Sequence, residues 1–260
     1  MKILVSGKGG SGKSTISVLL AYALKNAGHP ILLIDADESN FCLHRLLGAP
    51  APKNLMNKMG GRKGVREKLP RSKAASSNDR LFDKDLTWDD LPNGSLTEID
   101  GIKLMVMGKI EQFGEGCACL LGSLSRTLLS KLREKNHQYV IIDAEAGIEH
   151  FGRRVDSTCD LIIGVVDPTH ESFSMAKRMA QMAVAAGVDI RYILNKVDHR
   201  VERIMAEKID ADKVIGRVPN HEAIITASLE GHPLTIDIAS IGDVITFLEF
   251  YRPKTQLKIM

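Results

Sequence analysis

A glycine-rich segment near the amino terminus carries the residues best suited to phosphate chemistry. The run GKGGSGKS, from Gly7 to Ser14, fits the pattern G-x-x-x-x-G-K-[ST] and lies between an apolar run and a stretch with helical spacing. Amides of such a loop wrap a phosphate, and the positive end of the following helix stabilises its charge. We expect Lys13 to bridge the β- and γ-phosphates of a nucleotide and the Ser14 hydroxyl to ligate Mg²⁺. The loop residues expected to bind the nucleotide are Gly7, Lys8, Gly9, Gly10, Ser11, Gly12, Lys13, Ser14 and Thr15.

A pair of cysteines offers metal chemistry. The stretch GEGCACLLG, residues 114–122, sets Cys117 and Cys119 one residue apart. Residues two apart in an extended segment point the same way, so both sulfurs can face one ion, whereas a disulfide between them is geometrically poor. Two thiolates leave a tetrahedral or square-planar ion short of ligands, and a symmetric partner chain would supply the other two. Soft thiolates suit Zn²⁺ or Ni²⁺, and also Cu(I) or an iron–sulfur cluster. Two thiols packing a loop are the alternative.

The other thiols and one histidine are weaker candidates. Cys42 and Cys159 have apolar sequence neighbours, so we expect inert core thiols. His150 could relay nucleotide state or take metal, but a surface or packing role is expected.

The elements that must position these residues follow from apolar runs. Continuous runs indicate buried strands, and stretches with helical spacing lie between most of them. This alternation is typical of an α/β fold with a mostly parallel central sheet and helices on both faces. The expected strands cover residues 2–6, 31–35, 102–107, 139–143, 161–166 and 190–195, and a helix should begin near Leu120.

Composition and length narrow the class of protein. We expect the 260 residues to form a single domain, 1–260. A net charge of +3 is too small to indicate a nucleic-acid partner. The amino terminus has no secretory pattern and no apolar run is long enough for a membrane span, so we expect a cytoplasmic protein without a membrane partner. Residues 53–80 are basic and poor in large apolar side chains, which favours a mobile surface insertion over a partner-docking segment.

The phosphate motif resembles that of a known family. A second lysine, Lys8, gives the form K-G-G-x-G-K-[ST], which resembles the deviant Walker A ATPases, a P-loop NTPase group that includes MinD, ParA and the nitrogenase iron protein. The resemblance implies that Lys8 reaches the phosphates of a partner in a nucleotide-sandwich dimer. It also implies Mg²⁺-dependent hydrolysis of ATP to ADP and phosphate.

Further positions are similar to the family pattern. Asp37 in IDADESN occupies the switch I position that orients the attacking water, with Asp35 as a structural strand-end acid. Asp143 in IIDAEAG occupies the Walker B position, which holds Mg²⁺ through water, and Gly147 follows it in switch II. The resemblance makes Lys8, Lys13, Asp37 and Asp143 the catalytic set. It also implies that the adenine lies against Asn195 in ILNKV and Pro219 in GRVPN.

A narrower resemblance brings the cysteines and the nucleotide together. FGEG followed by C-x-C, with DAEAGIEHFGR and VVDPTHESFSMAKRM, resembles the CooC-type nickel-inserting accessory ATPases of carbon monoxide dehydrogenase. That resemblance implies a homodimer whose Cys117 and Cys119 share Ni²⁺ or Zn²⁺ across the interface, with the apo-dehydrogenase as client. The length and charge of segment 53–80 depart from it.

Two other functions are compatible with the phosphate motif. One is a positioning ATPase of the MinD or ParA kind, which binds membrane or DNA. The carboxyl-terminal stretch FLEFYRPKTQLKIM contains Pro253 and has a weak apolar face, which argues against membrane docking. The other is an electron-transfer ATPase like the nitrogenase iron protein, which takes its cluster cysteines from two separate loops.

Overall fold

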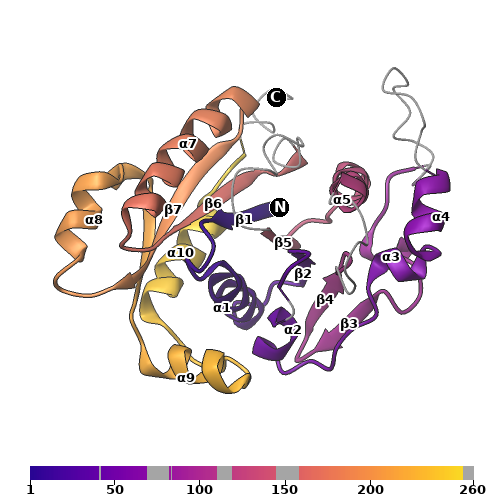
Figure 1. The fold of residues 1–260 in the computed structure, drawn as a ribbon, viewed down its shortest axis with the longest axis horizontal. Coiled ribbons are helices and arrows are strands. Elements are labelled where there is room, and N and C mark those ends of the chain that lie inside the picture. Colours follow the sequence, from indigo (N-terminus) through magenta and orange to yellow (C-terminus); the bar gives the residue numbers. More distant parts are fainter. Residues whose placement is uncertain (41, 69–81, 83, 110–118, 145–157, 254–260) are drawn as a thin grey trace.

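A single sheet dominates the part of the chain that the structure describes. The computed structural model describes residues 1–40, 42–68, 82, 84–109, 119–144 and 158–253. Within these ranges eight strands follow the order β3-β4-β2-β5-β1-β6-β7-β8 (Figure 1). The strands are β1 (Lys2–Gly7), β2 (Ile31–Ala36), β3 (Leu96–Ile99), β4 (Ile102–Val106), β5 (Tyr139–Ala144), β6 (Leu161–Val166), β7 (Asp189–Val197) and β8 (Val214–Pro219). All neighbours are parallel except the edge pair of β3 and β4.

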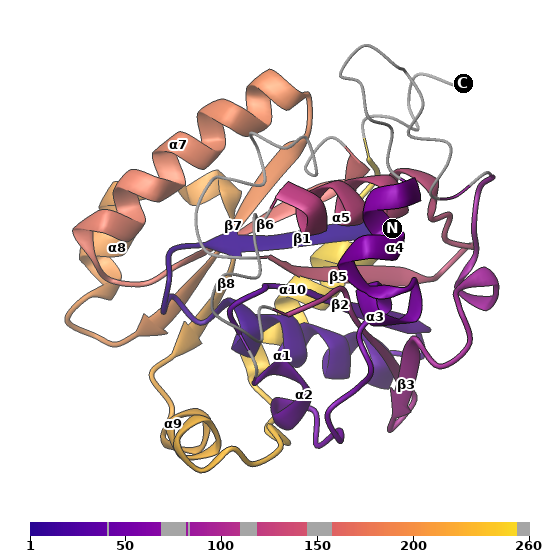
Figure 2. The same cartoon turned by 45° about the vertical axis from the view of Figure 1, so that its right-hand side comes forward.

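Helices cover both faces of this sheet, as the sequence predicts (Figure 2). The helices of the described ranges are α1 (Lys13–Asn26), α2 (Leu43–Leu46), α3 (Leu55–Lys58), α4 (Gly61–Lys68), α5 (Cys119–Lys131), α7 (His170–Ala186), α8 (Glu202–Lys208), α9 (Glu222–Glu230) and α10 (Ala239–Phe250). One buried cluster joins α1 and α10 to one face, and a second joins α5, α7 and α8 to the other. Continuous burial of the central strands follows from this double cover.

The position of β1 determines where a ligand can approach. β1 lies in the middle of the sheet between β5 and β6, while β2 lies on one side of it and β7 on the other. The connection after β1 runs to one side, toward β2, and the connection after β6 runs to the other, toward β7, which opens a crevice beyond the carboxyl ends of the strands. The segment 7–15 follows β1 directly and lies at that edge.

One segment differs from the expectation for the surface of the molecule. Residues 54–68 are not a mobile insertion: Asn54 caps α3, and Leu55 and Val65 are fully buried in the cluster that includes α5. The few apolar residues of this basic stretch have helical spacing, so they form a buried face. Residues 69–80 of the expected insertion lie outside the described residues. No helix within the described ranges combines the length and apolar character that a membrane span requires.

Candidate functional site

The segment between β1 and α1, residues 7–15, is called the phosphate loop here. The Ser11 amide donates to the Lys8 carbonyl over 3.1 Å, which folds the loop back on itself. Gly12 has φ of 96°, and a Cβ built there would lie 2.2 Å from Nδ2 of Asn195. Both the backbone conformation and the space therefore require glycine at this position. The result is a tight turn that ends at the first residue of α1.

The start of α1 leaves room for an anion. Gly12 is the N-cap and provides no side-chain hydrogen bond to the first turn, so the helix begins without an internal cap. First-turn amides have no intrahelical partner and carry the positive end of the helix dipole. Lys13 begins the same turn with a buried side chain whose Nζ donates to the Lys8 carbonyl over 3.3 Å. The loop therefore gathers amides and a cation at one point.

A buried carboxylate faces the first turn of α1. Asp143, near the end of β5, accepts from the Ser14 hydroxyl over 2.7 Å and from the Ser17 hydroxyl over 3.1 Å. Burial raises the pKa of Asp143 to about 6, against the opposing effects of the Ser14 hydrogen bond and the nearby Lys13 charge. A hydroxyl and a carboxylate in contact are hard oxygen ligands of the type that Mg²⁺ prefers. Their chemistry fits the magnesium site expected from the sequence.

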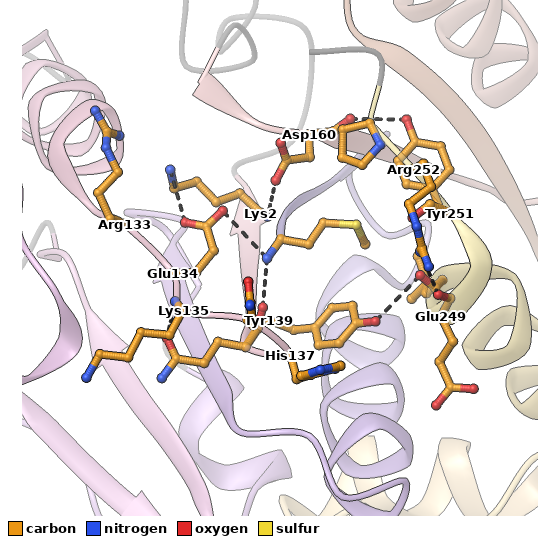
Figure 3. A pocket seen from close by; sticks show the side chains of 15 residues that line it. Lys2, Arg133, Glu134, Lys135, His137, Tyr139, Asp160, Glu249, Tyr251 and Arg252 are labelled. Atoms are coloured by element: carbon orange, nitrogen blue, oxygen red, sulfur yellow. Dashed lines mark hydrogen bonds and ion pairs between the residues drawn. The ribbon is translucent and has the colours of Figure 1, made fainter. Parts of the chain in front are cut away.

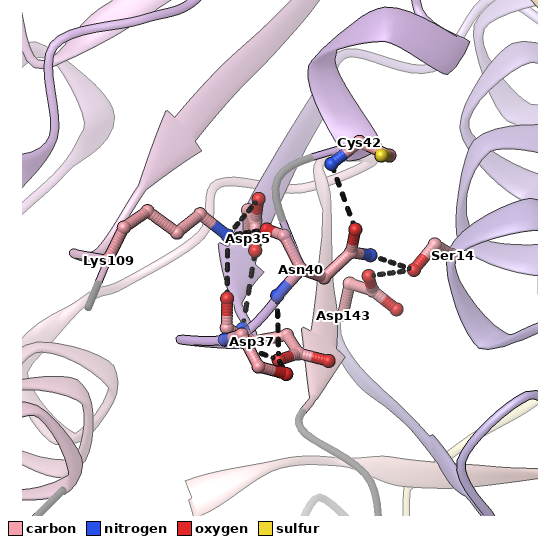
Figure 4. Close-up of polar contacts among 8 residues, drawn as sticks. Ser14, Asp35, Asp37, Asn40, Cys42, Lys109 and Asp143 are labelled. Carbon is pink, nitrogen blue, oxygen red and sulfur yellow. Dashed lines mark hydrogen bonds and ion pairs between the residues drawn. The ribbon is translucent and has the colours of Figure 1, made fainter. Parts of the chain in front are cut away.

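The loop after β2, residues 37–40, is called switch I here, and it lies against this pair (Figure 4). Asp35 and Asp143 are register partners on adjacent strands, which brings the ends of β2 and β5 together. Oδ1 of Asp37 accepts from the Ser39 amide over 2.9 Å and from the Asn40 amide over 3.2 Å. The Asn40 side chain donates to the Ser14 hydroxyl oxygen over 2.7 Å. Switch I is thereby hydrogen-bonded to the phosphate loop.

Lys109 is a site residue that the sequence reasoning missed. It follows β4, and its Nζ donates to Oδ2 of Asp35 over 2.7 Å, to the Asp37 carbonyl over 2.6 Å, and to the Asn40 carbonyl. Burial raises the pKa of Asp35 to about 7, although the Lys109 charge and hydrogen bond act in the opposite direction. The sequence did offer a signal for this residue: a lysine shortly after a buried apolar strand, whose neighbouring strand carries an acid near its end.

Lys8 has partners within its own chain. Its Nζ lies 3.8 Å from Oδ2 of Asp167, 3.8 Å from Oε2 of Glu171 and 3.5 Å from the Thr169 hydroxyl. Lys196 also approaches this group, with its Nζ 2.7 Å from the Gly10 carbonyl and 3.9 Å from Asp167. The expected role of Lys8 across a dimer stays a prediction, because the structure contains one chain.

The two residues expected at the adenine lie on neighbouring strands. Asn195 on β7 is buried, and its Nδ2 donates to the Ser11 carbonyl over 2.7 Å, so its side chain supports the phosphate loop. Pro219 is the exposed last residue of β8, whose register pairs it with Val197. Contact of either residue with a base stays a prediction.

The expectations for the cysteines, and for Gly147 and His150, have different outcomes. Cys117, Gly147 and His150 lie outside the described residues. Cys119 is the first residue of α5, one residue before the position near which the sequence predicts this helix to begin, and its expected role as a metal ligand stays a prediction. Cys159 is buried as expected. Cys42 is exposed and not a core thiol: it is the N-cap residue of α2, and the next residue, Leu43, is the one that is buried. In the described ranges no group of three or more His, Cys, Asp or Glu side chains forms a metal site.

A separate charged pocket lies at the amino ends of β1, β5 and β6 (Figure 3). It has a volume of about 430 Å³. The Lys2 amide donates to Asp160 over 2.7 Å, and Nζ of Lys2 lies 3.3 Å from Glu134. Lys2 thus contacts two acidic residues of this pocket, which occupies the edge of the sheet opposite the phosphate loop.

Comparison with known proteins agrees with this geometry. The model of the CobQ/CobB/MinD/ParA nucleotide binding domain matches residues 2–234. The chain belongs to this nucleotide-binding family. Among solved structures, MinD of Pyrococcus horikoshii OT3 in complex with Mg-ADP superimposes with a TM-score of 0.65 at 17% identity, covering 96% of this chain and 95% of that one. This likeness confirms the α/β fold of a CobQ/CobB/MinD/ParA protein.

Two curated proteins are similar to this chain along most of its length. An uncharacterised ATP-binding protein of Methanocaldococcus jannaschii is 44% identical over 248 residues, covering 95% of this chain and 99% of that protein. The carbon monoxide dehydrogenase accessory protein CooC of Rhodospirillum rubrum is 36% identical over 238 residues, covering 89% and 88%.

Proposed function

We propose that this chain is an ATP-dependent metallochaperone that assists nickel insertion into carbon monoxide dehydrogenase. The observation that carries the proposal is the 36% identity to the accessory protein CooC over 89% of this chain. The C-x-C pair, Cys117 and Cys119, supports it, because soft thiolates are suitable ligands for the cargo ion.

In this proposal the phosphate loop binds ATP and promotes its hydrolysis to ADP. The amides of the first turn of α1 bind phosphate oxygens, and Lys13 neutralises negative charge on them. The oxygens of Ser14 and Asp143 would hold Mg²⁺, which when bound neutralises phosphate charge. Asp37 orients the attacking water from switch I. Lys8 leaves Asp167 and Glu171 to reach the phosphates of a second copy.

The same second copy completes the cargo site. Two thiolates from each chain give four sulfur ligands for Ni²⁺ or Zn²⁺ at a two-fold axis. Since nucleotide and metal would both favour the homodimer, each should strengthen the binding of the other. Hydrolysis then weakens the dimer and releases the ion to the apo-enzyme.

The test compares metal content in cysteine variants. Wild-type protein, the double variant Cys117→Ser/Cys119→Ser and the control Cys42→Ser are loaded with Ni²⁺ and a non-hydrolysable ATP analogue. Each is then separated by size-exclusion chromatography with metal analysis. Wild type and the control should elute as dimers with about one ion per two chains, because Cys42 is an exposed thiol outside the pair. The double variant should carry none, and full metal content in it would reject the proposal.

A further inference from the structure

Lys109 connects two segments that are far apart in the sequence (Figure 4). Its side chain is 9% exposed and runs from the end of β4 to the end of β2 and to switch I. An ammonium carries three N–H donors. The acceptors here are the Asp35 carboxylate and the backbone carbonyls of Asp37 and Asn40. Lys109 therefore contacts both ends of switch I.

The contacts of Lys109 with two backbone carbonyls say more about its role than its contact with Asp35 does. A lysine that only neutralised the buried Asp35 would need no contact with the next five residues of the chain. The contact with the Asp37 carbonyl, at 2.6 Å, and the contact with the Asn40 carbonyl depend on the path of switch I. Any change in that path must either move Lys109 or break these bonds.

Asn40 extends this contact to the phosphate loop. Its carbonyl accepts from Lys109, while its side-chain amide donates to the Ser14 hydroxyl oxygen over 2.7 Å. Ser14 in turn donates to Asp143 over 2.7 Å. The Asn40 amide thus occupies a lone pair of the oxygen that Ser14 would offer to Mg²⁺. Because a hydroxyl oxygen has two lone pairs, Mg²⁺ at Ser14 would share this oxygen with Asn40, which links switch I directly to the expected magnesium ligand.

Lys109 also marks the start of another segment. The chain leaves β4 through Met107 and Lys109 and enters α5 at Cys119, so the C-x-C pair lies eight to ten residues beyond Lys109 in the sequence. Met107 is fixed beside it, because its amide donates to the Asp35 carbonyl over 3.0 Å. The end of β2 and the residues after β4 are therefore held together at the point where switch I begins.

We propose that Lys109 is a positioning residue that makes switch I and residues 107–109, which follow β4, respond together to nucleotide. This inference rests on the proposed function for its relevance to the cargo ion. It assigns the communication between the two sites to a single side chain.

Hydrogen exchange measured by mass spectrometry tests this inference without any transition metal. Exchange is compared between protein without nucleotide and protein with Mg²⁺ and a non-hydrolysable ATP analogue, in peptides that cover residues 35–43 and 104–122. Wild type should gain protection in both peptides. In Lys109→Met, the 35–43 peptide should still respond, whereas the response of 104–122 should fall to less than about half of the wild-type change.

Two variants control for charge and for stability. Lys103→Met removes a lysine of β4, the strand that precedes Lys109. The Lys103 ammonium lies over the Trp88 ring and not against switch I, so both peptides should respond as in wild type. Lys109→Arg keeps a cation with several donors and should restore part of the response. If Lys109→Met does not fold, the double variant Lys109→Met/Asp35→Asn removes the buried pair together and serves in its place.

The outcomes separate this inference from the proposed function. An undiminished response of 104–122 in Lys109→Met, or a wild-type protein in which that peptide never responds, would overturn the role of Lys109. Failure of the cysteine variants to lose metal would reject the cargo proposal while leaving the exchange result intact.

Discussion

At the scale of single residues, the pair of Asp35 and Lys109 shows how burial and charge oppose each other. The Asp35 carboxyl is almost fully buried, and burial raises its pKa to about 7 even though an ammonium lies 2.7 Å away. Removing one member of a buried ion pair costs about 3–5 kcal/mol, because the other charge is left without compensation. Burial offsets much of the attraction within the pair. The pair therefore fixes the positions of its two side chains more than it adds to the free energy of unfolding.

The raised pKa predicts a pH dependence of stability. Between the ordinary value of 3.8 and about 7, the folded state binds the Asp35 proton more tightly than the unfolded state does. The contribution of Asp35 to the free energy of unfolding should therefore fall as pH rises through this window, by up to about 1.4 kcal/mol per pH unit. Urea unfolding of wild type and Asp35→Asn at several pH values between 4 and 7.5 measures this fall in the free energy of unfolding.

The comparison with the variant removes the effect of other carboxyl groups. Wild type should lose more stability over that range than Asp35→Asn does, because the asparagine does not titrate. Parallel curves for the two proteins would show that the Asp35 pKa is not raised in the fold.

Individual site residues differed in how well the sequence predicted them. The phosphate loop was predictable because its glycines and lysine have fixed spacing, and the structure places it between β1 and α1. Lys109 was not, because its partners come from β2 and switch I, about 70 residues earlier in the chain. Cys42 was misjudged from apolar sequence neighbours, since local composition does not report the direction in which the chain turns.

At the scale of elements, burial explains which strands were predictable. The six expected strands are fully or mostly buried and read as continuous apolar runs. The sequence reasoning missed β3 and β8. β3 has four residues, mostly half-buried, and β8 contains Gly216 and Pro219, so neither carries a strong apolar signal.

The amino-terminal cap of α7 gives an element-scale prediction. The Thr169 hydroxyl accepts from the Ser172 amide over 3.3 Å, so Thr169→Ala should lower the free energy of unfolding by about 1 kcal/mol. For a chain of this size that corresponds to a melting temperature about 3 °C lower. Thermal unfolding followed by circular dichroism measures the shift.

An exposed threonine in a helix provides the control for this cap. Thr226 lies within α9, so Thr226→Ala should change stability by less than about 0.5 kcal/mol. Equal effects of the two substitutions would show that the cap contributes nothing specific.

At the scale of the whole molecule, the sheet separates two polar regions. The phosphate loop, switch I and Lys109 lie at the carboxyl edge, whereas the pocket of Lys2, Glu134 and Asp160 lies at the amino edge. In the described part of the chain, the carboxyl edge combines a helix start that has no side-chain cap with the oxygens of Ser14 and Asp143. The proposed dimer would therefore form over that edge.

The proposed link between nucleotide and metal predicts equal effects in both directions. If an ATP analogue tightens Ni²⁺ binding by some factor, Ni²⁺ must tighten binding of the analogue by the same factor, typically about 5–150-fold. Isothermal titrations of each ligand with and without the other measure the two factors. Cys117→Ser/Cys119→Ser should show no effect of Ni²⁺ on the analogue, and wild-type affinities that each ligand leaves unchanged would contradict the proposed link.

The two outer strands of the sheet limit how copies of this protein can join. β3 offers a ladder of only four residues, and β8 ends in an exposed proline that has no amide hydrogen to donate. Neither edge strand offers a neighbouring molecule a long row of backbone hydrogen-bonding groups. Concentrated protein should consequently resist growth into fibrous stacks through these two edges.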